Sequence, residues 1–271
     1  MSTRFRFRSL TLAAAAACVG LAAAPVLAQP AGVTKDEQKC ESGTGKTLSK
    51  FVGAKGKCAQ KCLATARKTS GPYTDCFPPY GGATLSCLED PVKGAEAKAE
   101  KGIIKACAKD CPECYGQMTC DTGQPFVDNT STQLDAFGTL VYCTEAGGNT
   151  PDKPQAKCED SVGKTLAKFV ASKTKCYDKC NANVFKGKLP EGSCNPPTPS
   201  DAATMACIQK AESKSVATID KACSAAGANP ACYNNAPAPN TGAGWTALAE
   251  AAVDAQVPII ACGSPSGAFL D

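Results

Sequence analysis

Apolar side chains recur at helical spacing along two long stretches of the chain, residues 36–68 and 155–185. In the first stretch Leu48, Phe51 and Val52 fall within about 100° of one another on a helical wheel, and lysine and alanine fill many of the other positions. Neither stretch holds a run of β-branched residues, and no part of the chain alternates with a sustained period of two. The pattern therefore predicts an all-α fold built on two long helices.

Shorter helices are expected after each long one. Loops rich in proline and glycine, residues 70–82 and 187–200, contain Pro-Pro steps through which a helix cannot continue. The further helices are predicted at residues 83–109 and 130–142 in the first half, and at 201–225 and 245–256 in the second. Within residues 83–109, Asp90 followed by Pro91 resembles a helix start, so this helix is expected to restart there.

The two halves of the chain repeat each other in sequence. The segment from Lys39, KCESGTGKTLSKFVGAKGKCAQKC, matches the segment from Lys157, KCEDSVGKTLAKFVASKTKCYDKC, at 15 of 24 positions without a gap. Eight cysteines recur in the same order in both halves, whereas Cys111 and Cys120 occur only in the first. We therefore expect two homologous disulfide-stapled helical domains, residues 29–150 and 151–271, each a helical hairpin plus a third helix.

The first 28 residues have the composition of an export signal. Three arginines precede an alanine-rich apolar stretch, and Val26-Leu27-Ala28 gives a signal peptidase small residues to read before Gln29. Cys18 lacks the branched residue three positions upstream that a lipid-modified cysteine usually has, so no lipid anchor is expected. No later segment reaches the roughly 18 apolar residues of a membrane span. The sequence predicts a secreted or periplasmic bacterial protein without a transmembrane segment.

Eighteen cysteines follow residue 28, and an oxidising compartment favours pairing such an even number. In an antiparallel helical hairpin the pairs nest, and the two cysteines added to the first half most simply bond to each other. The expected pairs are Cys40–Cys107, Cys58–Cys87, Cys62–Cys76, Cys111–Cys120 and Cys114–Cys143 in the first half, and Cys158–Cys223, Cys176–Cys207, Cys180–Cys194 and Cys232–Cys262 in the second. Because oxidised cysteines do not ligate metals, no metal or other cofactor is expected.

Each long helix has a cysteine face and an opposite lysine face. On a helical wheel Cys40, Cys58 and Cys62 cluster near Phe51, whereas the lysines fall roughly 100° away. Residues 39–68 carry a net charge of +7 and residues 157–188 carry +5, although the chain after residue 28 carries only +1. The lysines proposed to bind a ligand are Lys46, Lys50, Lys57 and Lys61 in the first half and Lys164, Lys168, Lys175 and Lys179 in the second.

Composition excludes several kinds of chemistry. The 271 residues include no histidine, so Ser-His-Asp or Cys-His catalysis and Cys/His zinc sites are absent. Gly45-Lys46-Thr47 imitates the end of a phosphate-binding loop, but Cys40 occupies the position of its first glycine and no strand precedes it. Glu41 and Glu159 follow the first shared cysteine of each half, where the helix dipole favours an acid.

These observations favour a non-catalytic binding or structural protein. Its lysine faces would bind an anionic polymer or surface, such as an anionic polysaccharide, extracellular nucleic acid or an acidic envelope surface. One alternative is a thiol-disulfide redox protein that uses Cys111 and Cys114, which have CxxC spacing. Another is a protease inhibitor or toxin-like scaffold that presents the Pro-Pro loop from Cys76 to Tyr80.

Overall fold

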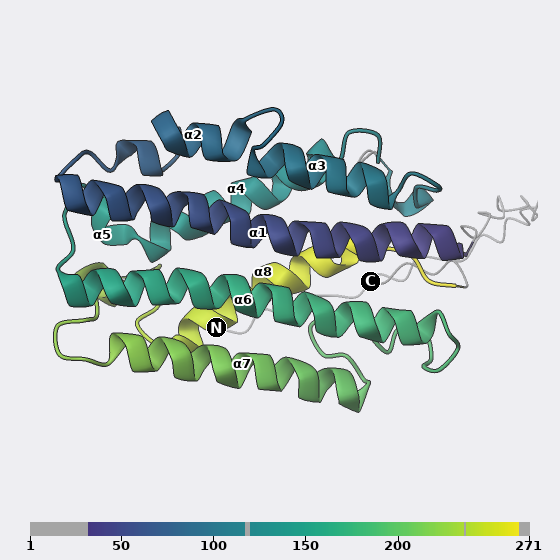
Figure 1. Cartoon of the computed structure of the whole chain (residues 1–271). Helices are drawn as coiled ribbons and strands as arrows, with labels where there is room; N and C mark the ends of the chain where they lie inside the picture. The colour runs from purple at the N-terminus through teal and green to yellow at the C-terminus, as the bar shows by residue number, and fades with distance from the viewer. Residues whose placement is uncertain (1–31, 117–119, 236, 266–271) are drawn as a thin grey trace, which may run out of the picture.

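The computed structural model describes residues 32–116, 120–235 and 237–265, and within them the chain is helical without a strand (Figure 1). The predicted export signal at residues 1–28, including Cys18, lies outside the described residues. The α-helices are α1 (Lys35–Thr69), α2 (Gly82–Glu89), α3 (Ala95–Ala106), α4 (Gln124–Val141), α5 (Cys143–Ala146), α6 (Lys153–Val184), α7 (Ala202–Cys223) and α8 (Gly242–Ile260). Short 3-10 helices η1 (Thr74–Cys76), η2 (Glu113–Tyr115) and η3 (Ala231–Asn234) lie in the connections.

Local sequence determines where each of the two long helices begins. Thr34 caps α1 by accepting a hydrogen bond from the Glu37 backbone N–H, and the Glu37 carboxylate accepts one from the Thr34 backbone in return. Asp152 and Gln155 make the same reciprocal pair at the start of α6. Such a capping box satisfies two backbone donors that a helix start leaves unpaired. The two halves thus begin their long helices in the same way with different residues.

The helix expected at residues 83–109, with a restart at Asp90-Pro91, is two helices. Helix α2 ends at Glu89, next to the expected break, whereas α3 begins later than expected, at Ala95, after a turn at residues 90–94. The Asp90 carboxylate accepts hydrogen bonds from the backbone N–H groups of Val92 and Lys93, which closes a turn in place of the helix. A Cβ atom at Gly94 would lie 2.5 Å from the carbonyl oxygen of Leu88, so this position needs glycine. Without such a break, α7 in the second half is continuous.

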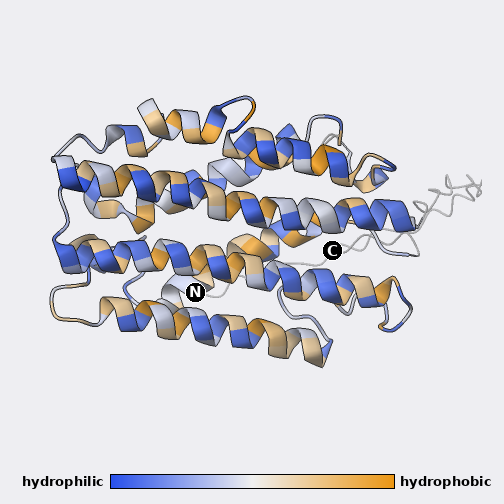
Figure 2. Cartoon of the chain, in the orientation of Figure 1, coloured by the Kyte–Doolittle hydropathy of each residue, from blue (hydrophilic) through white to orange (hydrophobic). Residues whose placement is uncertain are grey.

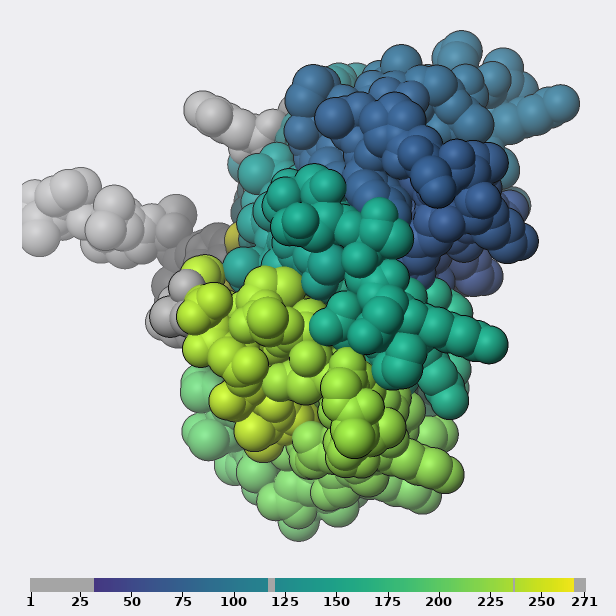
Figure 3. All heavy atoms as spheres, turned by 90° about the vertical axis from the view of Figure 1, so that its left-hand side faces the viewer, coloured from purple at the N-terminus to yellow at the C-terminus, as the bar shows by residue number. Residues whose placement is uncertain are grey.

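Helices α1 and α6 lie side by side and run in opposite directions (Figure 1). Gly163 near the start of α6 faces Gln60 near the end of α1, whereas Gly45 faces Thr174. The helices α2 and α3 pack on the outer side of α1, and α7 packs on the outer side of α6. Helices α4 and α8 lie behind the α1–α6 pair. In the end-on view of Figure 3 the two halves of the chain form adjoining parts of one body.

Disulfides fasten each long helix to the helices outside it. Seven of the expected cysteine pairs are present in the structure. They are Cys40–Cys107, Cys58–Cys87, Cys62–Cys76, Cys111–Cys120, Cys158–Cys223, Cys176–Cys207 and Cys180–Cys194. Bonds of this kind stabilise small-core proteins by about 2–4 kcal/mol each.

The two pairs expected for the tail helices, Cys114–Cys143 and Cys232–Cys262, are wrong. The structure instead bonds Cys114 to Cys262 and Cys143 to Cys232, with Cα atoms 5.8 and 6.1 Å apart. Helix α4 has 18 residues and spans about 27 Å, so the cysteines before and after it lie too far apart to bond. Because α1 and α6 run in opposite directions, the end of the second half reaches the start of α4. The two halves are therefore covalently crossed, and their division into two domains stays a prediction.

Cleaving the loop between the halves tests this crossing. A protease recognition sequence inserted after Gly148, in an exposed loop, should yield halves that migrate as one species without reductant and as two after reduction. Pairing within each half would instead release the two fragments without reductant. Denaturing electrophoresis of the cut protein, beside the uncut insertion variant, distinguishes these outcomes.

Candidate functional site

The lysines predicted to bind a ligand form two exposed rows. We define row 1 as Lys46, Lys50, Lys57 and Lys61 on α1, and row 2 as Lys164, Lys168, Lys175 and Lys179 on α6. The Lys46 ammonium lies 3.4 Å from the Asp178 carboxylate and is 63% exposed. Among the described residues, no acidic group lies within 4 Å of the other seven ammonium groups.

Both rows point to the same face of the molecule. On α1 the cysteine side is bonded to α2 and α3, the Gly45 side contacts α6, and Leu48 packs inward, which leaves only the lysine side free. Helix α6 has the same order of sides, with α7 on its cysteine side. Figure 2 shows hydrophilic residues alternating with hydrophobic ones along both α1 and α6, as expected for helices with one buried and one exposed side. Since adjacent helices lie 8–10 Å apart, the two rows form one basic surface.

Two other lysines, Lys55 and Lys173, are buried, which the sequence analysis missed. Their side chains are 4% and 0% exposed. The Lys55 ammonium lies 2.6 Å from the Asp135 carboxylate, and the Lys173 ammonium lies 2.5 Å from Glu250 and 2.8 Å from Asp254. Asp135 and Asp254 are each eight residues before the last shared cysteine of their half. This shared position in the repeat could have identified the two aspartates as equivalent partners of the buried lysines.

A tyrosine completes each buried lysine cluster from a different part of the chain. Tyr80, in the loop after η1, donates a hydrogen bond to Asp135 at 2.5 Å, and its ring lies below the Lys55 ammonium. Tyr177, on α6 itself, donates to Asp254 at 2.9 Å. Both clusters tie the tail helix of a half, α4 or α8, to its long helix. Their buried charges are paired, so the clusters fasten helices rather than offer free groups to a ligand.

Glu41, which the helix dipole alone explained in the sequence, is buried. It is 4% exposed and accepts a hydrogen bond from the Gly263 backbone N–H at 3.1 Å, beside the Cys114–Cys262 bond. Burial raises the pKa of Glu41 to about 8, so the folded protein holds this carboxyl protonated at neutral pH.

Glu159, the counterpart of Glu41, lies in a buried acidic pair. Its neighbour Glu145 is also buried, and Arg67 at the end of α1 binds both, with its Nε 2.7 Å from Glu145. Burial, together with the charge of Glu145, raises the pKa of Glu159 to about 8. Arg67 also contacts Asp160 at 3.2 Å, so this cluster joins α1, α5 and the start of α6.

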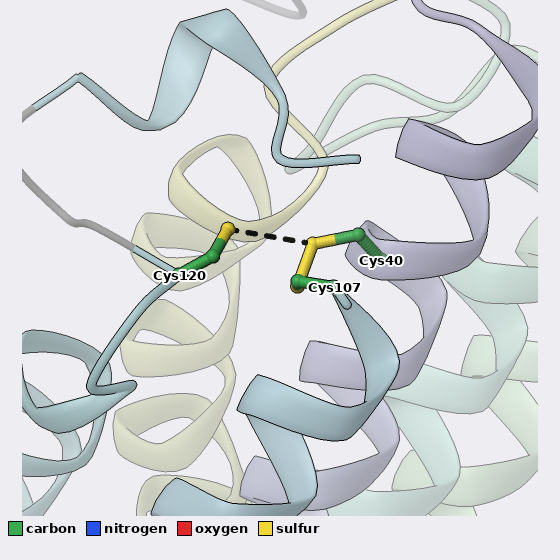
Figure 4. A group of neighbouring side chains, drawn as sticks. All are labelled: Cys40, Cys107 and Cys120. Atoms are coloured by element: carbon green, nitrogen blue, oxygen red, sulfur yellow. Dashed lines mark hydrogen bonds between the residues drawn. A yellow bond between two sulfur atoms is a disulfide. The ribbon is translucent and has the colours of Figure 1, made fainter. Parts of the chain in front are cut away.

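The cysteines proposed for redox chemistry are bonded to different partners. Cys111 is bonded to Cys120 and Cys114 to Cys262, so they do not form a CxxC disulfide. Cys120 lies 3.7 Å from Cys40, which places two disulfides in contact (Figure 4). In the described part of the chain, each cluster of cysteine and glutamate with metal-like spacing contains disulfide-bonded sulfurs, which offer no thiolate to a metal.

A long void, here called the lumen, runs between α1, α4, α6 and α8. Its total empty space is about 1610 Å³ including its open parts, of which about 200 Å³ admits the centre of a water molecule. Apolar residues such as Leu48, Leu166 and Val253 form most of its wall, and Phe77 and Pro78 of the Pro-Pro loop also line it. Nothing in the sequence pattern revealed this lumen.

No model of a known protein family, no characterised protein and no solved structure matches this chain. No helix in the described ranges is both long enough and apolar enough to cross a membrane. Nine disulfides in the described part of the chain are typical of proteins in an oxidising, extracellular environment. The functional conclusion therefore depends on the surface and the lumen of this chain itself.

Substituting the buried lysine tests the role of the lysine clusters. Lys173→Ala should lower the free energy of unfolding by about 3–5 kcal/mol, because it leaves Glu250 and Asp254 without their cation. The exposed Lys175→Ala, two residues along the same helix, should change it by less than about 0.5 kcal/mol. Urea unfolding of both variants measures the difference, and equal effects would contradict a fastening role.

Glu41→Gln tests the buried carboxyl. The folded protein keeps Glu41 protonated up to about pH 8, whereas the unfolded chain ionises it near its ordinary pKa of 4.5. The contribution of this carboxyl to the free energy of unfolding is therefore fully present below pH 4.5 and is lost as the pH rises to 8. Glu41→Gln has no group to ionise, so its free energy of unfolding should rise relative to that of wild type between these pH values, by at most ~5 kcal/mol.

Urea unfolding at pH 4, 6 and 8 measures that gain. The exposed Glu89→Gln serves as the control, since its difference from wild type should stay small at every pH. A Glu41→Gln difference that does not change between pH 4 and pH 8 would show that Glu41 is ionised in the folded protein.

Proposed function

We propose that this chain is an exported, non-catalytic protein that binds an anionic polymer through its two lysine rows. The observation that carries the proposal is that all eight lysines are exposed on one face and only Lys46 has an acidic partner among the described residues. A ligand with regularly spaced negative charges can contact several ammonium groups at once and release their counterions. Anionic polysaccharides and nucleic acids have this chemistry.

The spacing of the lysines supports an extended ligand. Within row 1 the Cα atoms of successive lysines rise by about 6, 10.5 and 6 Å along the helix axis, and row 2 has the same sequence intervals. The rows lie on long helices that disulfides and buried ion pairs fix, so binding would order few groups besides the lysine side chains. Charge elsewhere on the chain is net acidic, which favours one orientation of the polymer on this face.

The non-catalytic part of the proposal is supported by the chemistry of the described titratable groups. Glu145 and Glu159 are buried and bound by Arg67, and Glu250 and Asp254 are bound by Lys173, so a substrate would have to displace these cations to reach them. The histidine-dependent mechanisms are excluded by composition.

Neutralising row 1 tests polymer binding. The quadruple variant Lys46→Ala, Lys50→Ala, Lys57→Ala and Lys61→Ala should bind dextran sulfate and double-stranded DNA about tenfold or more weakly than wild type, with a shallower dependence on salt. The control replaces four exposed lysines on the outer helices, Lys101, Lys105, Lys210 and Lys214, and removes the same charge. Fluorescence anisotropy at salt concentrations between about 50 and 200 mM measures the affinity of each variant for each probe. It also measures how steeply that affinity falls with salt, which reports the number of counterions released.

Three outcomes would overturn the proposal. The first is that wild type binds neither probe at the lower salt concentration. The second is that the row 1 variant binds both probes as tightly as wild type does. The third is that the control variant loses as much affinity as the row 1 variant. The third outcome would mean that only net charge matters, without a role for this face.

A further inference from the structure

The lumen is long and narrow rather than compact. Its lining extends on α1 from Gln38 to Gln60, which is about 33 Å along the helix axis, and on α6 from Gly163 to Asn181. About half of the lining residues are aliphatic, glycine or alanine, and most of the wall surface is apolar. A void of this shape matches one linear hydrocarbon chain better than a fused-ring molecule.

Small residues keep the lumen open. A Cβ atom added at Gly56 or Gly138, both of which line it, would meet no heavy atom within 4 Å. Ala167 and Ala252 line it at other levels. Larger apolar residues at these positions would fill the space between the helices, as in ordinary cores. Apolar cavities in proteins take up apolar ligands.

The disulfides oppose collapse of the lumen. Cys58 and Cys176 hold α1 and α6 to the outer helices α2 and α7, away from the lumen. The buried pair Lys55–Asp135 fixes α4 to α1 in the lumen wall. The disulfides thus hold α1 and α6 from their outer sides, and the buried ion pairs Lys55–Asp135 and Lys173–Glu250 tie α4 and α8 to them.

One end of the lumen reaches the basic face. Its lining there includes Ser42, Asp178 and Asn181, which are polar and partly exposed. The Lys46 ammonium of row 1 lies 3.4 Å from Asp178, which lines this end of the lumen. An amphiphile with its apolar chain in the lumen would have its polar head at this end, where the surrounding charge favours an anion.

We propose that the lumen binds one single-chain anionic amphiphile, a long-chain fatty acid, with its hydrocarbon chain between α1, α4, α6 and α8 and its carboxylate beside Lys46. This activity is separate from polymer binding, because the chain occupies the lumen and the polymer occupies the surface of the rows. The two activities share only the border of the basic face.

A matched pair of glycine substitutions on α1 tests the proposal. Gly56→Leu places a side chain in the lumen, whereas Gly53→Leu lies three residues away, outside the lumen lining and equally free of contacts. Titration calorimetry with palmitate below its critical micelle concentration should show one site per wild-type chain. Gly56→Leu should weaken binding by about tenfold or more, as expected for a filled pocket, and Gly53→Leu should leave it unchanged.

Further measurements keep the result interpretable. Gly138→Leu fills the lumen from α4 and should also weaken palmitate binding, and thermal unfolding of each variant shows whether it is folded. Hexadecanol, which has the same chain without the charge, should bind more weakly than palmitate to wild type, and Lys46→Ala should reduce that difference. Dextran sulfate binding by Gly56→Leu should equal that of wild type whether or not fatty acid binds.

The proposal is overturned if wild type takes up no palmitate, or if folded Gly56→Leu and Gly138→Leu bind it as wild type does. Equal loss in Gly53→Leu would place the chain outside the lumen and also overturn it. Hexadecanol binding as tightly as palmitate would overturn the anionic part. None of these measurements uses a polymer, so they test fatty-acid binding even if the protein turns out to bind no anionic polymer.

Discussion

The structure depends on the two disulfides that cross between the halves of the chain. Cys114–Cys262 and Cys143–Cys232 join the tail of each half to the other half, at opposite ends of the antiparallel α1–α6 pair. Each crossing has a buried glutamate beside it, Glu41 at one and Glu159 at the other. Both ends of the four inner helices are therefore closed covalently, and buried residues such as Leu166, Phe169 and Trp245 pack between them beside the lumen.

Lysine has two opposite roles in this fold, and the surrounding helices decide between them. Lys55 and Lys173 lie on the inward sides of α1 and α6, where a carboxylate from the tail helix and a tyrosine hydroxyl compensate the burial of their charge. The lysines of the two rows lie on the outward sides of the same helices, exposed to water. The buried, paired lysines fasten the helices to one another, and the exposed lysines, of which only Lys46 has an acidic partner among the described residues, leave positive charge on one face for an anionic partner.

The lumen and the basic face belong to the same arrangement. Bonding α1 and α6 to outer helices on their cysteine sides leaves the two lysine rows on one surface, and the lumen lies behind that surface. In this protein, the residues that stabilise the fold differ from those proposed to bind ligands. Disulfides and buried ion pairs stabilise it, while small residues and exposed lysines remain free to contact other molecules.

The sequence by itself determined the helices, the disulfide pairs within each hairpin and the faces of the long helices. These follow from local periodicity and from cysteines that an antiparallel hairpin brings together, as with Cys58 and Cys87. Only the tertiary structure decided the crossing of Cys114 and Cys143, because this depends on the direction of α4 and on α6 running opposite to α1. The burial of Lys55 and Glu41 and the existence of the lumen were decided in the same way, since each requires helices that are distant in sequence to meet around one residue or one void.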